Sequence, residues 1–393
     1  MIDSFYLAWK YIRFNKVKTA TLIACVTLIA FLPPALQRLL EESEREFMSR
    51  AHSTPLIVGA KGSALDLVMN ALYFSDNAPQ PITMGSKDAV QGSGLAVAIP
   101  VYVRFKVRGQ PVVGTTLDYL DFRGLRVAQG RAMAFLGDCV LGARVAERLG
   151  IGAGENLVSA PENPFDLAGV YPLKMTVAGV LASSGTPDDQ AIFVDLKTAW
   201  VIEGIGHGHQ DLAASQDESL ISSQTDSGIT ANAKLKQYSE IDPANLASFH
   251  FHGDPASYPI TAVLTVPPDQ KSAAILRGRF LAAEETNQIV KPSEVIAGLL
   301  QNVFRIKQLV DAVIVVVALA TVMAIALVLT LSLRLRQREM HTVVMLGGSR
   351  LTVVRLMAAE VFIIALMSAL LCLALIRSLD PLAGDLARWL FVR

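Results

Sequence analysis

The chain has 393 residues with 35 basic and 35 acidic side chains; 52% of its residues are hydrophobic and only 18% are charged. Because soluble domains usually carry about a quarter charged residues, and the mean hydropathy here is +0.42, we expect part of the chain to lie in a membrane. The balanced charge excludes a strongly basic nucleic-acid binder, and three cysteines are too few for a disulfide-stapled scaffold.

Three apolar segments predict transmembrane helices, the first of them at residues 19–40. Four basic residues in the N-terminal segment 1–18 precede it and a run of glutamates follows it, and its length favours an uncleaved helix over a signal peptide. The segments 309–333 and 356–376 are also long enough to cross a hydrocarbon core of ~30 Å.

Basic residues are concentrated in the short segments beside these helices, which predicts their orientation. Residues 1–18 and 334–355 carry an excess of Lys and Arg, so both are predicted to be cytoplasmic. Between residues 41 and 308 the chain holds 22 basic and 29 acidic side chains, and we expect this region outside. Three crossings also place the C-terminal tail, 377–393, outside, although its three arginines favour the opposite side.

The long exterior region mixes strand and helix patterns without regular alternation, which predicts a large α+β extracytoplasmic domain beside the α-helical transmembrane segments. Alternating or β-branched runs predict strands at 97–107, 174–181, 191–194 and 260–266. Helical spacing predicts helices at 64–73, 143–149 and 272–285. The polar stretch 206–245 has few large apolar residues and is predicted to be an inserted loop or mobile subdomain.

Four histidines form two copies of one pattern, H-x-H-x-D, at the two ends of this polar stretch. The residues of the two copies are His207, His209 and Asp211, and His250, His252 and Asp254. Residues i and i+2 of a strand project to one side, and imidazole with carboxylate suits a transition metal such as zinc. We therefore weigh a zinc site in the exterior domain against the alternative that these histidines are ordinary side chains of a solvated loop.

Several motifs carry a family resemblance that extends over nearly the whole chain. They are R-L-R-Q-R-E at 334–339, L-G-G-S-R at 346–350, Glu360, Q-G-R at 129–131, V-L-G-A-R-V-A-E-R-L-G-I-G at 140–152 and V-G-A-K-G-S at 58–63. With this architecture the sequence resembles the MacB/FtsX-type permeases of ABC transporters, the type VII superfamily. The resemblance implies a MacB-like periplasmic core domain and a fourth transmembrane helix. No fourth span is found here, and truncation and a three-helix subgroup both remain open.

The resemblance also implies a coupling role for the segment after the second predicted helix. The residues expected to couple to an ATPase are Arg334, Arg336, Arg338, Glu339, Gly347 and Gly348. No G-x-x-x-x-G-K-[ST] phosphate loop occurs in the sequence, so this chain is expected to be non-catalytic and ATP hydrolysis is expected in a separate subunit, present in two copies. A second permease chain, identical or similar, the lipid bilayer, and a periplasmic protein or lipoprotein are further expected partners.

The implied function is to pass ATP-driven motion from that ATPase to the exterior domain, for export or extraction of an unknown substrate, in a bacterial inner membrane. Two alternatives stay open. In the first, the chain is a non-transporting regulator of an extracytoplasmic enzyme. In the second, it is a membrane-anchored metal-binding protein.

Overall fold

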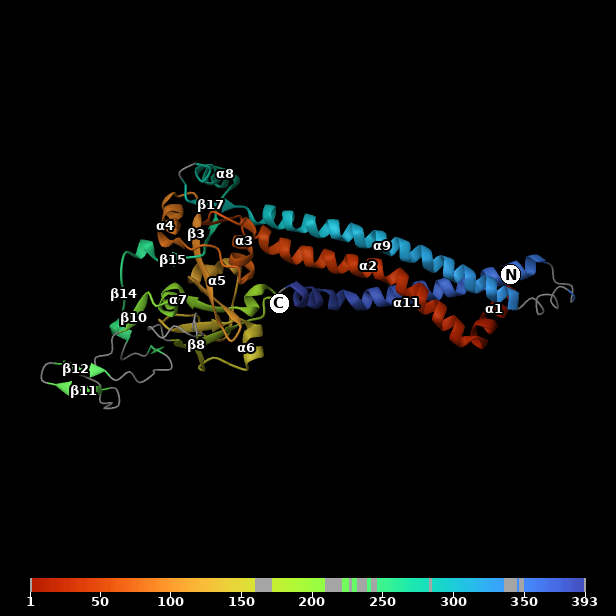
Figure 1. Cartoon of the computed structure of the whole chain (residues 1–393), viewed down its shortest axis with the longest axis horizontal. Helices are drawn as coiled ribbons and strands as arrows, with labels where there is room; N and C mark the ends of the chain where they lie inside the picture. The colour runs from red at the N-terminus through yellow and green to blue at the C-terminus, as the bar shows by residue number, and fades with distance from the viewer. Residues whose placement is uncertain are drawn as a thin grey trace. The chain divides into compact units, whose positions relative to one another are not determined.

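The computed structural model describes residues 2–159, 172–208, 221–225, 228–231, 239–241, 246–282, 285–335, 345 and 350–391. The chain divides into two units, of which the first contains Met1–Met48 and Ala297–Arg393 and the second contains Ser49–Ile296 (Figure 1). The second unit lies within the region predicted to be outside the membrane.

The first unit is built from long helices: α1 (Ile2–Phe14), most of α2 (Lys16–His52) and α9 (Pro292–Leu335), and α11 (Arg350–Phe391). Within the described residues, Lys16–Leu39 and Leu351–Leu379 are long and apolar enough to cross a membrane. A shorter apolar segment, Asp311–Ala320, lies in the predicted second span.

Two features of these helices differ from the simplest sequence interpretation. Helix α2, with Pro33 and Pro34 inside it, continues past the predicted end at residue 40 as far as His52. Helix α11 continues beyond the third predicted span as far as Phe391, so the described part of the C-terminal tail is helical. Helices α1 and α11 pack together, with the rings of Phe5 and Phe362 edge to face at 5.9 Å.

The second unit is organised around an eleven-stranded mixed sheet in the part of the chain that the structure describes. Its principal order is β13-β8-β6-β9-β4-β3-β16-β1-β17, with β5 and β7 also paired to β8. The strands are β1 (Leu56–Ala60), β3 (Val97–Val107), β4 (Gln110–Thr115), β5 (Val127–Gly130), β6 (Asp138–Leu141), β7 (Asn156–Val158), β8 (Leu173–Leu181), β9 (Ile192–Asp195), β13 (Ser239–Glu240), β16 (Ala262–Val266) and β17 (Asn287–Val290).

Pairing in this sheet is mostly antiparallel. The parallel pairs are β4 with β9, β6 with β8, and β13 with β8. Among the described residues, small two-stranded sheets are also formed by β2 (Ile82–Thr83) with β15 (Pro259–Ile260), β10 (Gly206–Gly208) with β14 (Phe249–Phe251), and β11 (Ile221–Thr225) with β12 (Gly228–Ala231).

Short helices surround the sheet and bury its apolar side chains. They are α3 (Ala64–Tyr73), α4 (Met84–Gly92), α5 (Leu117–Arg123), α6 (Ala143–Leu149), α7 (Leu196–Glu203), α8 (Gln270–Arg279), and the 3₁₀ turns η1 (Pro187–Gln190), η3 (Leu246–Ser248) and η4 (Pro255–Ser257). Side-chain caps fix where several begin: Ser63 accepts from the backbone N–H of Asp66, and Asp195 accepts from that of Lys197. The fully buried side chains of Tyr102, Tyr119 and Phe193 are among the largest in the core.

The α+β prediction for this unit is confirmed, and several element boundaries agree with the sequence patterns. Strand β3 and helices α3 and α6 occupy the predicted ranges. The predicted strand 260–266 is instead two strands, because Thr261 leaves the register and its backbone N–H donates to the carbonyl of Val101. The predicted helix 272–285 is wrong at both ends. The Asp269 side chain accepts from the backbone N–H of Ser272 and caps the helix, which therefore starts at Gln270. The helix ends at Arg279.

The polar stretch 206–245 contains more regular structure than an inserted loop. Its described residues include β10, β11 and β12, and also β13, which pairs in parallel with β8 in the main sheet. Figure 1 shows β10 and β14 near α7, with the β11–β12 ribbon beyond them. The stretch therefore returns to the sheet before β14 begins.

Gly142 marks a close approach between two segments of the domain. It precedes α6, and its backbone N–H donates to the carbonyl of Ala191 at 2.9 Å. A Cβ at this position would lie 2.5 Å from the carbonyl atoms of Asp189 in η1, and closer still to the carbonyl oxygen of Asp188. Only glycine therefore allows α6 to start against η1 without moving that turn.

We expect Gly142→Ala to lower the free energy of unfolding of the exterior unit by about 1–3 kcal/mol, because the added methyl overpacks a backbone contact. The measurement is urea unfolding of the full chain in mild detergent, followed by the fluorescence of buried Trp200 after Trp9 and Trp389 are changed to Phe. Gly152→Ala is the matched control, since its Cβ would meet nothing nearer than 3.9 Å. Equal stability of the two variants would contradict the contact.

Candidate functional site: a buried arginine at the end of helix α2

Arg50 lies in the last turn of α2 and belongs to the second unit. Its side chain is only 6% exposed. A buried guanidinium is costly unless its donors are bonded and its charge is paired, so its surroundings show what the end of α2 is attached to.

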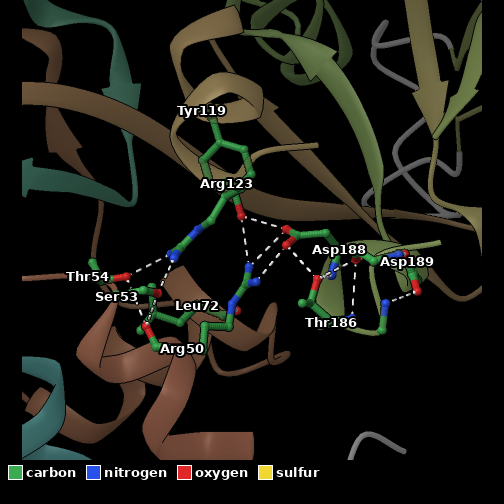
Figure 2. Close-up of polar contacts among 11 residues, drawn as sticks. Arg50, Ser53, Thr54, Leu72, Tyr119, Arg123, Thr186, Asp188 and Asp189 are labelled. Atoms are coloured by element: carbon green, nitrogen blue, oxygen red, sulfur yellow. Dashed lines mark hydrogen bonds and ion pairs between the residues drawn. The ribbon is translucent and has the colours of Figure 1, made fainter. Parts of the chain in front are cut away.

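Each nitrogen of this guanidinium donates to a partner from a different part of the domain (Figure 2). Nε donates to the carbonyl of Leu72 at 2.5 Å. Nη1 and Nη2 donate to the two carboxylate oxygens of Asp188 at 2.6 and 2.9 Å, and Nη2 also donates to the hydroxyl of Tyr119 at 2.9 Å. This is the bidentate arrangement that the planar guanidinium favours.

The Asp188 carboxylate is likewise bonded on both oxygens. Besides Arg50 it accepts from the Tyr119 hydroxyl at 2.8 Å and from the Thr186 hydroxyl at 2.9 Å. Burial alone would raise the pKa of Asp188, but the charge of Arg50 and these hydrogen bonds outweigh burial and lower it. Burial raises the pKa of Tyr119, so its phenol stays protonated and can donate to the carboxylate.

Arg123 forms a second layer around the end of α2. Its Nη1 donates to the Ser53 hydroxyl at 3.0 Å and its Nη2 to the Thr54 hydroxyl at 2.8 Å. Those two hydroxyls in turn donate to the carbonyl of Arg50, one of the carbonyls in the last turn of α2 that lack a partner within the helix. Burial, and then the charge of Arg50, lower the pKa of Arg123.

The turn that carries Asp188 is held from its other side by Asp189. The carboxylate of Asp189 accepts from the backbone N–H groups of Ser184 and Gly185 and from the hydroxyls of Ser183 and Ser184, at 2.8 to 3.0 Å. Together with the Gly142 contact, these bonds fix η1. The pair formed by Arg50 and Asp188 therefore joins α2, the end of α3, α5 and η1 into one rigid clamp, which we call the α2 clamp.

The α2 clamp is suited to holding elements together and not to bond-breaking chemistry. Its acid is ionised and occupied by donors, and its phenol is protonated and hydrogen-bonded. Sequence reasoning did not single out Arg50, Tyr119 or Asp188. The only signal was an arginine at the end of a long helix, and nothing in the sequence pairs it with an aspartate 138 positions away.

Two of the motifs that suggested the family resemblance, at 129–131 and 140–152, lie in the same unit. In Q-G-R, Nη1 and Nη2 of Arg131 donate to the two carboxylate oxygens of Asp138 at 2.5 and 3.0 Å. Gly130 has a φ of +76°, and a Cβ there would strike the carbonyl of Ala178. These residues are structural in the described domain.

The structure places the predicted coupling residues only in part. Arg334 is exposed in the last turn of α9. The other five, Arg336, Arg338, Glu339, Gly347 and Gly348, lie outside the described residues.

For the predicted metal residues, the second copy of the histidine pattern is described more fully than the first. The rings of His250 and His252 are neighbours, with centroids 4.6 Å apart. The backbone of His207 is the register partner of His250, whereas His209 and Asp211 lie outside the described residues. Asp254 caps η4 by accepting from Ala256 N at 2.9 Å. Within the described residues no group of three or more His, Cys, Asp or Glu side chains forms a metal site.

We expect Arg50→Ala to destabilise the exterior unit by about 3–5 kcal/mol, because it leaves the buried Asp188 carboxylate without its counter-charge. Arg50→Lys should recover only part of this loss, since an ammonium cannot form the bidentate pair. Urea unfolding followed by Trp200 fluorescence measures both. Lys106→Ala, at the exposed pair with Asp76, is the control and should cost no more than about 1 kcal/mol. A cost as small for Arg50→Ala would show that the clamp does not stabilise the domain.

The lowered pKa of Asp188 makes the clamp sensitive to acid. Because the folded pKa is lower than the unfolded value near 4, the stability it contributes is complete above about pH 4 and is lost as the pH falls through the folded pKa. Tyr119→Phe removes one bond to the carboxylate, so it should bring the folded pKa closer to the unfolded one and reduce the pH dependence. Unfolding free energies between pH 2.5 and 6 test this. An identical slope in Tyr119→Phe would contradict the assignment.

Comparison with known proteins places the domain in a family. The family model of the MacB-like periplasmic core domain matches residues 24–244, more than half of the chain. No curated protein shows a significant match. A structure of the periplasmic region of MacB from Actinobacillus actinomycetemcomitans is 10% identical, with a TM-score of 0.35, and the alignment covers 63% of this chain and 93% of that one.

A structure of the extracellular domain of the ABC-type transporter YknZ from Gram-positive bacteria is 12% identical, with a TM-score of 0.33 and coverage of 60% of this chain and 98% of that one. The assignment rests on the family model, which covers most of the predicted first membrane helix, the α2 clamp and most of the sheet. The chain belongs to the MacB-like periplasmic core domain family, that of the MacB/FtsX-type ABC transporter permeases.

Proposed function

We propose that this chain is the transmembrane subunit of an ABC transporter in a bacterial inner membrane, and that it passes ATP-driven motion of a separate ATPase to its extracytoplasmic domain. The observation that carries this proposal is the attachment of α2 to the domain. One uninterrupted helix contains both a candidate membrane span, Lys16–Leu39, and the buried Arg50. If α2 ended in a flexible linker, its rotation or shift would not reach the domain. The α2 clamp allows α2 to pass such a movement to the domain.

The second connection supports the same proposal. Strand β1 follows α2 after a few residues, and β17 ends at Val290, just before α9 begins at Pro292. These two strands are antiparallel neighbours in the sheet, with Ile57 opposite Val290. The helices that enter and leave the domain are therefore linked to adjacent strands, so relative movement of α2 and α9 acts directly on one hydrogen-bonded pair.

The motor is proposed to be a pair of separate ATPase subunits acting on two permease chains. The sequence holds no phosphate loop, and the resemblance assigns ATPase coupling to Arg334 and the residues that follow it. Family membership supports export or extraction of a substrate as the work of this assembly. If the ATPase associates and responds but nothing is transported, the regulatory alternative replaces transport.

Two variants separate binding of the ATPase from transmission of its motion. We expect the full chain in mild detergent to co-purify with a phosphate-loop ATPase, and a variant with Arg334, Arg336, Arg338 and Glu339 changed to Ala to lose it. Changing the exposed Arg277 and Arg279 to Ala removes the same net charge on the exterior unit and should retain it. Arg50→Lys should retain the ATPase and transmit less.

Transmission is measured with spin labels at Leu281→Cys, an exposed site on the exterior unit, in a chain whose native cysteines are replaced. In the native background the distance between labels on two permease chains should change when a non-hydrolysable ATP analogue is added. The change should shrink at least about twofold in Arg50→Lys, because the bidentate grip is lost. Absence of any ATPase would reject the proposed function. An unchanged response in Arg50→Lys would reject the clamp as its route.

A further inference from the structure

Helix α1 has one buried face, which packs against the other helices of the first unit. Its side chains Ala8 and Ile12 are only 1% and 6% exposed. Ile12 forms a buried cluster with Leu22 of α2 and Ile364 of α11. Most of the remaining described side chains of α1 are exposed, so this helix presents a second face whose surroundings the chain itself does not supply.

The junction between α1 and α2 is ordered by hydrogen bonds. Helix α1 ends at Phe14, α2 begins at Lys16, and the chain bends at Asn15 between them. The hydroxyl of Thr19 in α2 donates to the carbonyl of Ile12 at 3.5 Å. Helix α1 is therefore attached directly to the start of the first candidate membrane span.

Helix α1 lies across α11. The rings of Phe5 and Phe362 are edge to face at 5.9 Å. Two turns further along α1, Ile12 clusters with Ile364. Phe5 and Ile12 are about 10 Å apart along α1, whereas their partners are only about 3 Å apart along α11. Because α11 contains the candidate membrane span Leu351–Leu379, a helix that crosses it lies close to the plane of the bilayer.

The exposed face of α1 combines basic and aromatic side chains. Tyr6 is 60% exposed and Trp9 is 47% exposed, and Lys10 and Arg13 are exposed beside them. Residues three or four positions apart share one side of a helix, so Tyr6, Lys10 and Arg13 lie together. The ammonium of Lys10 is 5.5 Å from the centre of the Tyr6 ring. This side of α1 is therefore positively charged and amphipathic.

Exposed apolar side chains lie next to this basic side. Leu7 is 55% exposed and Phe14 is 87% exposed, and their spacing of seven residues puts them on one side of the helix. Apolar and aromatic residues beside Lys and Arg are typical of a helix that lies in a membrane interface, with its apolar side at the acyl boundary. Long basic side chains then reach the headgroups.

The charge of this segment determines which headgroups fit it. We propose that the exposed face of α1 binds anionic phospholipids of the cytoplasmic leaflet through Lys10, Arg13 and Lys16. All three side chains are exposed, and basic residues beside a membrane span attract anionic lipids. A zwitterionic lipid offers a phosphate but no net charge, so it binds less well. The proposal rests on the membrane location of the first unit and not on ATPase coupling.

The test uses the full chain in lipid nanodiscs made of equal parts of phosphatidylcholine and phosphatidylglycerol. Trp200→Phe and Trp389→Phe leave Trp9 as the fluorescent indole. One lipid at a time carries bromine near the head of its acyl chains, where it quenches a neighbouring indole. We expect brominated phosphatidylglycerol to quench Trp9 at least about twofold more than brominated phosphatidylcholine. High salt should reduce the difference.

Three variants of this chain test the role of the charges. The triple variant Lys10→Gln, Arg13→Gln, Lys16→Gln should abolish the difference between the two lipids. The charge-conserving variant Lys10→Arg, Arg13→Lys, Lys16→Arg should keep it, which distinguishes a loss of charge from a misfolded helix. The matched control removes the same charge from exposed positions of the exterior unit and should also keep it: Lys271→Gln, Arg277→Gln, Arg279→Gln.

The native chain alone can overturn the proposal. Equal quenching by the two brominated lipids would show that α1 does not select anionic headgroups. Absence of quenching by either lipid would show that protein, such as a second copy of this chain, covers this face. Neither result bears on ATPase association, which is measured by co-purification.

Discussion

A buried ion pair at the end of helix α2 fixes the arrangement of the exterior domain. Removing a guanidinium and a carboxylate from water costs several kcal/mol for each ion, and this cost is offset only when the geometry is correct. Arg50 and Asp188 meet that condition because Leu72, Tyr119 and Thr186 complete their hydrogen bonds. Each contributing element is therefore held in one position, and a displacement of any of them leaves a charge uncompensated.

Close backbone packing supports the pair from outside. Gly142 and Gly130 stand where a side chain would strike a neighbouring strand or turn, and Gly179 meets the backbone of Arg131 in the same way. The family motifs at 129–131 and 140–152 thus include residues whose small size lets segments touch. Close-packed protein interiors yield little under strain. Under the proposed function, a force applied to α2 would move the surrounding elements together.

Local patterns in the sequence predicted the α+β class and several elements, because alternation and helical spacing are properties of neighbouring residues. Strand β3 and helix α3 are examples. The α2 clamp could not be predicted, since its ion pair joins positions 50 and 188 and depends on how distant elements pack. The histidine pattern could be predicted only in part. Its repetition was visible in the sequence, but the backbone pairing of residue 207 with His250 required the strand register.

The place of β1 in the sheet has a consequence for biogenesis. This strand is made early, at Leu56–Ala60, yet both its neighbours, β16 and β17, come from residues 262–290. Pairing over such a long separation carries a large loop-closure cost and folds slowly. The sheet can close around β1 only after nearly the whole domain has crossed the membrane. Until then β1 has two open edges, whose unpaired N–H and C=O groups can pair with another strand.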